Sequence, residues 1–107
     1  MDFQELLKDL KKNLAEILGD QYTDFKKETK ADIEGFLEAS KDKLERWTKL
    51  LANGELSPEE YEWLVKSQKD LLTLKGLQQV GISKISLGHF KNKVVKTIVE
   101  VVKGLVF

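Results

Sequence analysis

The sequence contains no cysteine, one proline, one histidine and a single arginine among its 107 residues. The lack of cysteine excludes a disulfide framework, a thiolate metal site and a cysteine nucleophile. One proline and seven glycines argue against a turn-rich all-β fold. No apolar run approaches the roughly 20 residues of a membrane span, and the N-terminus lacks the basic start and apolar stretch of a secretory signal. We therefore expect a cytoplasmic protein.

Charged residues of both signs are abundant, at 34% of the chain, and they sum to a formal net charge of zero. The apolar fraction of 41% is too high for a wholly disordered chain, and the length favours one helical domain over residues 1–107. Nucleic acid is a poor candidate partner because the chain has no basic excess and only Arg46 as an arginine. Arginine is the usual side chain for gripping phosphates and reading bases.

Apolar residues in the first half recur every eleven positions, which is about 3.67 residues per helical turn. One row consists of Phe3, Leu14, Phe25, Phe36 and Trp47. A second row contains two hydroxyl residues and consists of Leu7, Leu18, Thr29, Ser40 and Leu51. A third row begins at a lysine and consists of Lys11, Tyr22, Ile33 and Leu44. The repeat, which is shared with right-handed coiled coils, predicts helices with a nearly straight apolar stripe, and ordinary core packing is enough to require it.

Two glycine positions interrupt this pattern differently. Gly19 follows Leu18 at a plausible helix end, yet the eleven-residue phase passes through it without a slip, which favours a kink or short break there. Asn53-Gly54 is a stronger stop signal. Ser57, Pro58 and Glu60 then match an N-cap, a first helical residue and a capping box, so they predict a new helix.

The second half is predicted to hold two helical segments separated by residues 81–88. The first runs from Pro58 to about Val80, with Tyr61, Leu64, Val65, Leu71, Leu72, Leu74 and Leu77 on its apolar side. Residues 81–88 contain two glycines and two serines, which fits a short extended linker or a frayed helical turn. The fold class is therefore all-α. It is either an antiparallel helical hairpin with arms kinked near Gly19 and Gly88, or a four-helix arrangement over about 2–18, 21–52, 58–80 and 89–105.

The last third of the chain is both basic and rich in apolar residues. Residues 71–107 carry six lysines and one glutamate, a net charge of +5. The apolar residues that end the chain cover more than half of a helix circumference, whereas a lone surface helix needs a narrower stripe. They are Val94, Val95, Ile98, Val99, Val101, Val102, Leu105, Val106 and Phe107. This helix is therefore central in a bundle, buried in an oligomer interface, or placed on another apolar surface, with a strand over residues 101–105 as an alternative.

No catalytic, metal or cofactor site is predicted. The only histidine, His89, has no acidic residue within ten positions, and the Glu-x-x-His step of di-iron bundles is absent. Carboxylate pairs at helical spacing, such as Glu34 with Glu38, lie among lysines, as on a solvated helix face. We therefore expect no enzyme.

Self-association is the leading functional hypothesis, with a two-fold dimer as the simplest closure. Its predicted interface is the apolar face of the C-terminal helix, formed by Phe90, Val94, Ile98, Val101, Val102, Leu105 and Phe107. Secondary candidates are Phe36, Trp47 and Trp63. A weaker possibility is an adaptor that presents the same helix to a different protein.

The alternative hypothesis is a protein that binds the surface of anionic membranes. Lipid headgroups would then contact Lys91, Lys93, Lys96 and Lys103. The apolar residues beneath them would be Val99, Val102, Val106 and Phe107. The simpler explanation of the basic charge is a solvated face paired with acids of the first helix, such as Asp2, Glu5, Asp9 and Glu16.

Overall fold

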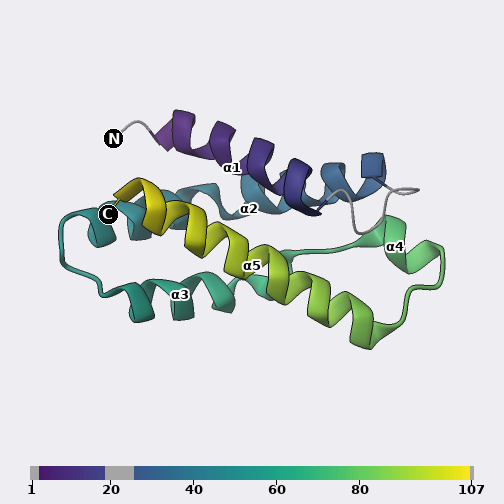
Figure 1. Cartoon of the computed structure of the whole chain (residues 1–107). Coiled ribbons are helices and arrows are strands. Elements are labelled where there is room, and N and C mark those ends of the chain that lie inside the picture. Colours follow the sequence, from purple (N-terminus) through teal and green to yellow (C-terminus); the bar gives the residue numbers. More distant parts are fainter. Residues whose placement is uncertain (1–2, 19–25, 107) are drawn as a thin grey trace.

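The helices follow one another with short connections in the computed structural model, which describes residues 3–18 and 26–106. They are α1 (Phe3–Leu18), α2 (Lys26–Ala52), α3 (Pro58–Ser67), the 3-10 helix η2 (Lys69–Leu71), α4 (Lys75–Gln79) and α5 (Lys84–Val106) (Figure 1). The described residues include no strand, which confirms the all-α prediction and shows that residues 101–105 are helical.

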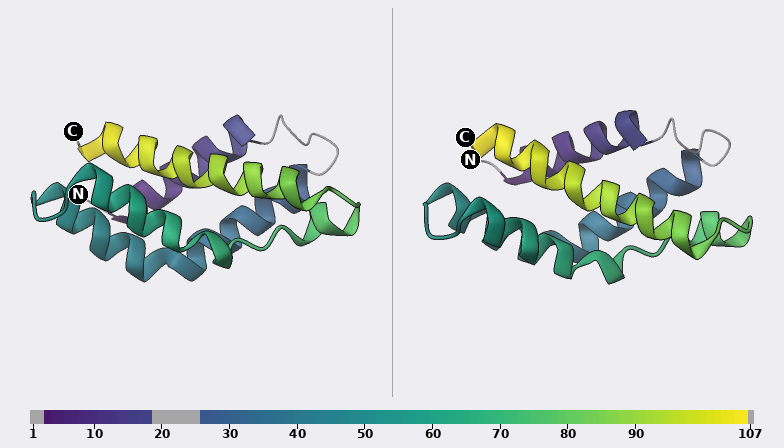
Figure 2. Two further views of the ribbon diagram at one scale, coloured as in Figure 1. Left: turned by 90° about the horizontal axis from the view of Figure 1, so that it is seen from below. Right: turned by 60° about the horizontal axis from the view of Figure 1, so that its bottom comes forward.

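The four longer helices pack around one core. Both α1 and α3 contact α2 and α5, and Figure 1 shows α5 running between α1 and α3 with α2 behind it. Figure 2 shows α3 and α5 side by side from two further directions. The longest dimension is 43 Å, whereas hairpin arms of about 50 residues would each be about 75 Å long if straight. The arrangement is therefore the folded-back, four-helix one. The predicted kink near Gly19 lies outside the described residues.

The eleven-residue rows face this core. The row members whose side chains are described are buried except for Trp47 and Lys11, which are half-buried. The buried set is Phe3, Leu7, Leu14, Thr29, Ile33, Phe36, Ser40, Leu44 and Leu51. At the edge of the stripe, Lys11 Nζ donates to Glu38 Oε1 at 2.9 Å, and this bond lowers the pKa of the Glu38 carboxyl. The repeat thus marks the packing face of α1 and α2.

The corner between α2 and α3 contains the predicted glycine turn and the predicted helix N-cap. Gly54 adopts a φ of 77°, a left-handed conformation that favours glycine. Ser57 Oγ accepts from the Glu60 backbone N–H, and Glu60 Oε1 accepts from the Ser57 backbone N–H, each at 3.1 Å. This is the capping box, and the bond from Ser57 lowers the pKa of Glu60.

Tyr61 ties α3 to α2 through a buried hydrogen bond. Its hydroxyl lies 3.1 Å from Thr48 Oγ1, and its side chain is fully enclosed. Burial raises the pKa of Tyr61 to about 12, although the bond with Thr48 acts in the opposite direction. The phenol therefore stays neutral at pH values well above the ordinary pKa of tyrosine.

The predicted continuous helix over 58–80 is wrong. Helix α3 ends at Ser67, η2 follows, and Leu72 is extended with φ −78° and ψ 102°. Side chains then alternate: Leu72 and Leu74 are buried while Leu71 and Thr73 are exposed. An alternation of period two needs extended backbone, because a helix would bring Leu71 and Leu74 to one face. The helix therefore breaks after Ser67, and the extended chain that follows buries both Leu72 and Leu74.

The second correction concerns residues 81–88. The chain turns at Gly81, whose φ is 87°, and α5 already begins at Lys84. Ser83 Oγ accepts from the Ser86 backbone N–H at 3.1 Å, which satisfies a donor at the start of the helix. The helix continues through Gly88, so this glycine neither forms a linker nor ends a segment.

Candidate interaction surface

The predicted oligomer interface is mostly part of the core of the single chain. Four of its seven residues are at most 1% exposed, namely Phe90, Val94, Ile98 and Val102. Val101 is half-buried, Leu105 is 53% exposed, and Phe107 lies outside the described residues. In this packing the buried face of α5 is occupied by the other helices. The wide apolar stripe therefore reflects a central position in the bundle.

The outer face of α5 carries the polar residues at helical spacing. Its exposed stripe consists of Ile85, His89, Lys93, Lys96 and Glu100. Lys103 continues this stripe, whereas Lys91 lies on another side of the helix. Both are half-buried, so all four predicted headgroup lysines reach the surface, three of them on the outer face. Of the apolar residues predicted beneath them, Val99 and Val102 are buried in the core, whereas Val106 is half-buried.

Three of the predicted headgroup lysines, Lys91, Lys96 and Lys103, take part in none of the ion pairs found between the described residues. The ion pairs found between described residues join Lys11 to Glu38, Lys49 to Glu45 and Lys66 to Glu62. None of these three pairs joins α5 to Glu5, Asp9 or Glu16 of α1, and Asp2 lies outside the described residues. Lys69 Nζ donates to Asn92 Oδ1 at 3.2 Å, which places a further cation at the edge of the face.

Among the exposed large apolar side chains of the described residues, two are far more exposed than the others. Ile85, on the first turn of α5, is 75% exposed, and Trp63, in the middle of α3, is 73% exposed. The apolar side predicted for the helix at 58–80 did not include Trp63, but Ile85 was missed, because residues 81–88 were interpreted as a linker or a frayed helical turn. The recurrence of isoleucine and leucine at positions 82, 85 and 87 was the available signal.

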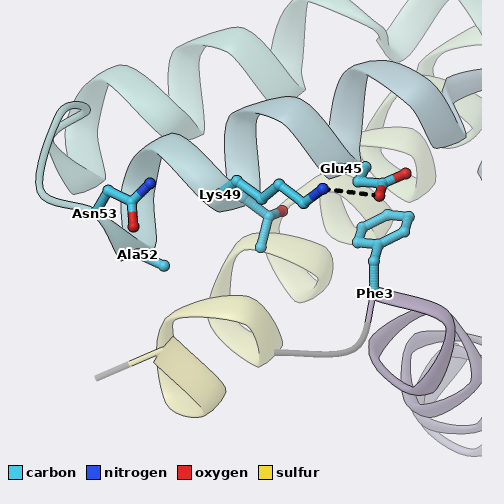
Figure 3. A pocket seen from close by; sticks show the side chains of 6 residues that line it. Phe3, Glu45, Lys49, Ala52 and Asn53 are labelled. Carbon is cyan, nitrogen blue, oxygen red and sulfur yellow. Dashed lines mark ion pairs between the residues drawn. The ribbon is translucent and has the colours of Figure 1, made fainter.

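A hollow of about 310 Å³ lies between the start of α1 and the end of α2 (Figure 3). It is lined by Phe3, Glu45, Thr48, Lys49, Ala52 and Asn53. Lys49 Nζ lies 3.1 Å from Glu45 Oε1, so the two charges of the lining compensate each other. The Thr48 hydroxyl is already bonded to Tyr61. A ligand in the hollow would therefore meet the ring of Phe3 and the ion pair of Lys49 with Glu45.

The described residues hold no group of three or more histidine, aspartate or glutamate side chains placed to bind a metal ion. None of the described helices is long and apolar enough to cross a membrane. Comparison of the chain with protein-family models, with curated proteins and with solved structures found no match. The basic outer face of α5 is thus the strongest candidate for an interaction surface.

Proposed function

We propose that the chain is a non-enzymatic module that binds the surface of anionic membranes through the outer face of α5. The observation that carries the proposal is the division of this helix into two faces. Its apolar face is enclosed by the chain, and its outer face presents lysines with few acidic neighbours. Self-association through the apolar face ranks second, because Phe90, Val94 and Ile98 would have to leave the core.

Electrostatic attraction supplies most of the binding energy in this proposal. Each lysine near an anionic leaflet contributes about 1 kcal/mol, and the outer face of α5 carries Lys93, Lys96 and Lys103. Ile85 adds an apolar contact at the start of the same stripe, since it is exposed. The helix lies along the membrane plane, because its lysines are distributed over most of its length.

Flotation with vesicles tests the proposal. The full chain is expected to float with phosphatidylserine vesicles and to remain behind with neutral phosphatidylcholine vesicles. High salt is expected to weaken flotation because exposed charges are screened. The double variant Lys93→Gln/Lys96→Gln is expected to bind about 30-fold more weakly, which corresponds to roughly 2 kcal/mol.

The matched control removes two exposed lysines elsewhere. Lys8 lies on α1 and Lys43 on α2, and both are exposed. Lys8→Gln/Lys43→Gln changes the net charge equally, so it separates a specific face from overall charge. Equal loss in both double variants, or equal flotation with neutral vesicles, would show that α5 is not the binding face. Circular dichroism of each variant confirms that the helices remain folded.

A further inference from the structure

Trp63 is the centre of a second surface that is independent of the proposed function. It lies midway along α3, and its neighbours one turn away on the same face are Glu59, Glu60, Lys66 and Ser67. All four neighbours are exposed. An exposed tryptophan surrounded by polar residues is typical of an interface anchor, since tryptophan is enriched among the residues that dominate binding energy.

The charge around Trp63 changes sign along the helix. The first half of α3 carries Glu59, Glu60 and Glu62, and the second half carries Lys66. Lys66 has only a long contact with Glu62, at 3.7 Å, so it can be exchanged for another acidic partner. The face is therefore complementary to itself when it is turned end to end.

We propose that α3 is a homotypic docking surface, on which two copies of the chain pair antiparallel through Trp63 about a two-fold axis. At a rise of about 1.5 Å per residue, Glu59 lies about 6 Å before Trp63 and Lys66 about 4.5 Å after it. A two-fold axis at Trp63 therefore sets Glu59 of one copy close to Lys66 of the second copy. The same contact occurs twice, as an isologous interface requires.

The charge balance favours a second copy over a membrane as the occupant. Residues 54–70 carry five acidic residues and two lysines. An anionic lipid surface offers these acids no cation, whereas a second copy turned end to end brings its Lys66 to Glu59. The patch is small beside the roughly 1,200–2,000 Å² of a stable complex. The paired state is accordingly a weak, concentration-dependent dimer, and it leaves the outer face of α5 outside the contact.

Sedimentation of the full chain over micromolar to millimolar concentrations tests this pairing. The mass is expected to rise from monomer toward dimer, and Trp63→Ser is expected to weaken association about tenfold or more. Leu105→Ser is the matched control, because it removes an exposed apolar side chain from α5 and is expected to leave the mass unchanged. A monomer at every concentration, or association that Trp63→Ser leaves intact, would overturn the proposal.

Charge reversal gives a sharper test that does not depend on tryptophan. Glu59→Lys and Lys66→Glu are each expected to prevent pairing, because like charges then meet twice in the dimer. An equimolar mixture is expected to restore the dimer, since every contact between the two variants is again attractive. Absence of this rescue contradicts the antiparallel geometry.

Fluorescence distinguishes the membrane from the second copy. In a Trp47→Phe background Trp63 is the only tryptophan, and its emission is expected to shift to the blue as protein concentration rises. A shift caused by anionic vesicles at a fixed low concentration would instead assign Trp63 to the membrane. Lys93→Gln/Lys96→Gln is expected to lower flotation without changing the dimer, so the two proposals fail separately.

Discussion

Helix α2 and the segment from Gln68 to Ser83 both bury leucines, but on different backbone conformations. Over its 27 residues α2 is continuous, and its buried side chains recur with the helical period. The segment after α3 passes through a 3-10 turn, an extended stretch and the five-residue α4. Its buried Leu72 and Leu74 alternate with exposed residues. Similar apolar content thus yields a helix where the stripe is long, and extended chain where two neighbouring leucines must reach one core.

Contact with α2 explains why the break occurs where it does. The Gly76 backbone N–H donates to Asp32 Oδ2 at 3.3 Å, so the start of α4 rests on the first half of α2. A straight continuation of α3 would carry Leu77 away from this contact, and Leu77 is fully buried in the folded chain. The irregular segment therefore closes the end of the core that α3 is too short to cover.

Truncation of a buried leucine in the segment after α3 is expected to have the largest effect on stability. Leu74→Ala is expected to lower the free energy of unfolding by about 2–5 kcal/mol, because it leaves a cavity in a closed core. Leu71→Ala is expected to cost under about 1 kcal/mol, since that side chain is 49% exposed. Urea denaturation measures both. Equal costs would indicate that the two residues share one helical face, as the continuous helix required.

Features that depend on adjacent residues were predictable from the sequence. The capping box at Ser57 and Glu60 and the stop at Asn53-Gly54 appear as expected, because each is complete within a few residues. The break after Ser67 was not predictable, because Leu71 and Leu74 fit a helical stripe equally well on paper. Only the position of α2 decides which of them is buried, and that is a tertiary contact.

Only part of the candidate surface on α5 was predictable, because the environment of its apolar residues also depends on tertiary contacts. Lys93 and Lys96 were identified from charge alone, and they are exposed. The apolar residues of α5 admitted three environments, and the sequence offered no way to choose the centre of the bundle. Ile85 was missed because glycines on both sides suggested a linker, whereas Gly88 lies inside the helix. Glycine lowers helix stability by only about 1 kcal/mol, which packing readily offsets.

The close approach of Gly76 in α4 to Glu28 in α2 allows a second test of the contact between the two regions. A Cβ atom on Gly76 would lie 2.7 Å from Glu28 Cβ, which is fixed to the backbone of α2 and has little freedom to move. Gly76→Ala is therefore expected to destabilise the fold by roughly 1–3 kcal/mol. Gly88→Ala is the control, because nothing lies within 4 Å of a Cβ there. It is expected to stabilise α5 by up to about 1 kcal/mol, so a loss of stability in both variants would contradict the contact.

The smallest expected effect concerns buried hydroxyls on regular helices. Thr29 Oγ1 in α2 is buried and has no hydrogen-bond partner in the described part of the chain, whereas Thr97 Oγ1 in α5 donates to the Lys93 carbonyl at 2.7 Å. Thr→Val keeps the shape and removes only the hydroxyl. Thr29→Val is expected to stabilise the chain by about 1 kcal/mol, because an unpaired polar group leaves the core. Thr97→Val is expected to be neutral or to cost about 1 kcal/mol, because a hydrogen bond is lost.

The sign of the difference between these two valine variants is the informative quantity, and urea denaturation of both under one set of conditions measures it. The helical propensities of threonine and valine are close, so the backbone contribution largely cancels. A stabilising Thr29→Val beside a neutral or destabilising Thr97→Val would show that the eleven-residue row tolerates Thr29 at a cost in stability. A destabilising Thr29→Val would instead mean that its hydroxyl has a partner in solution, and the row would then be polar at that position for a structural reason.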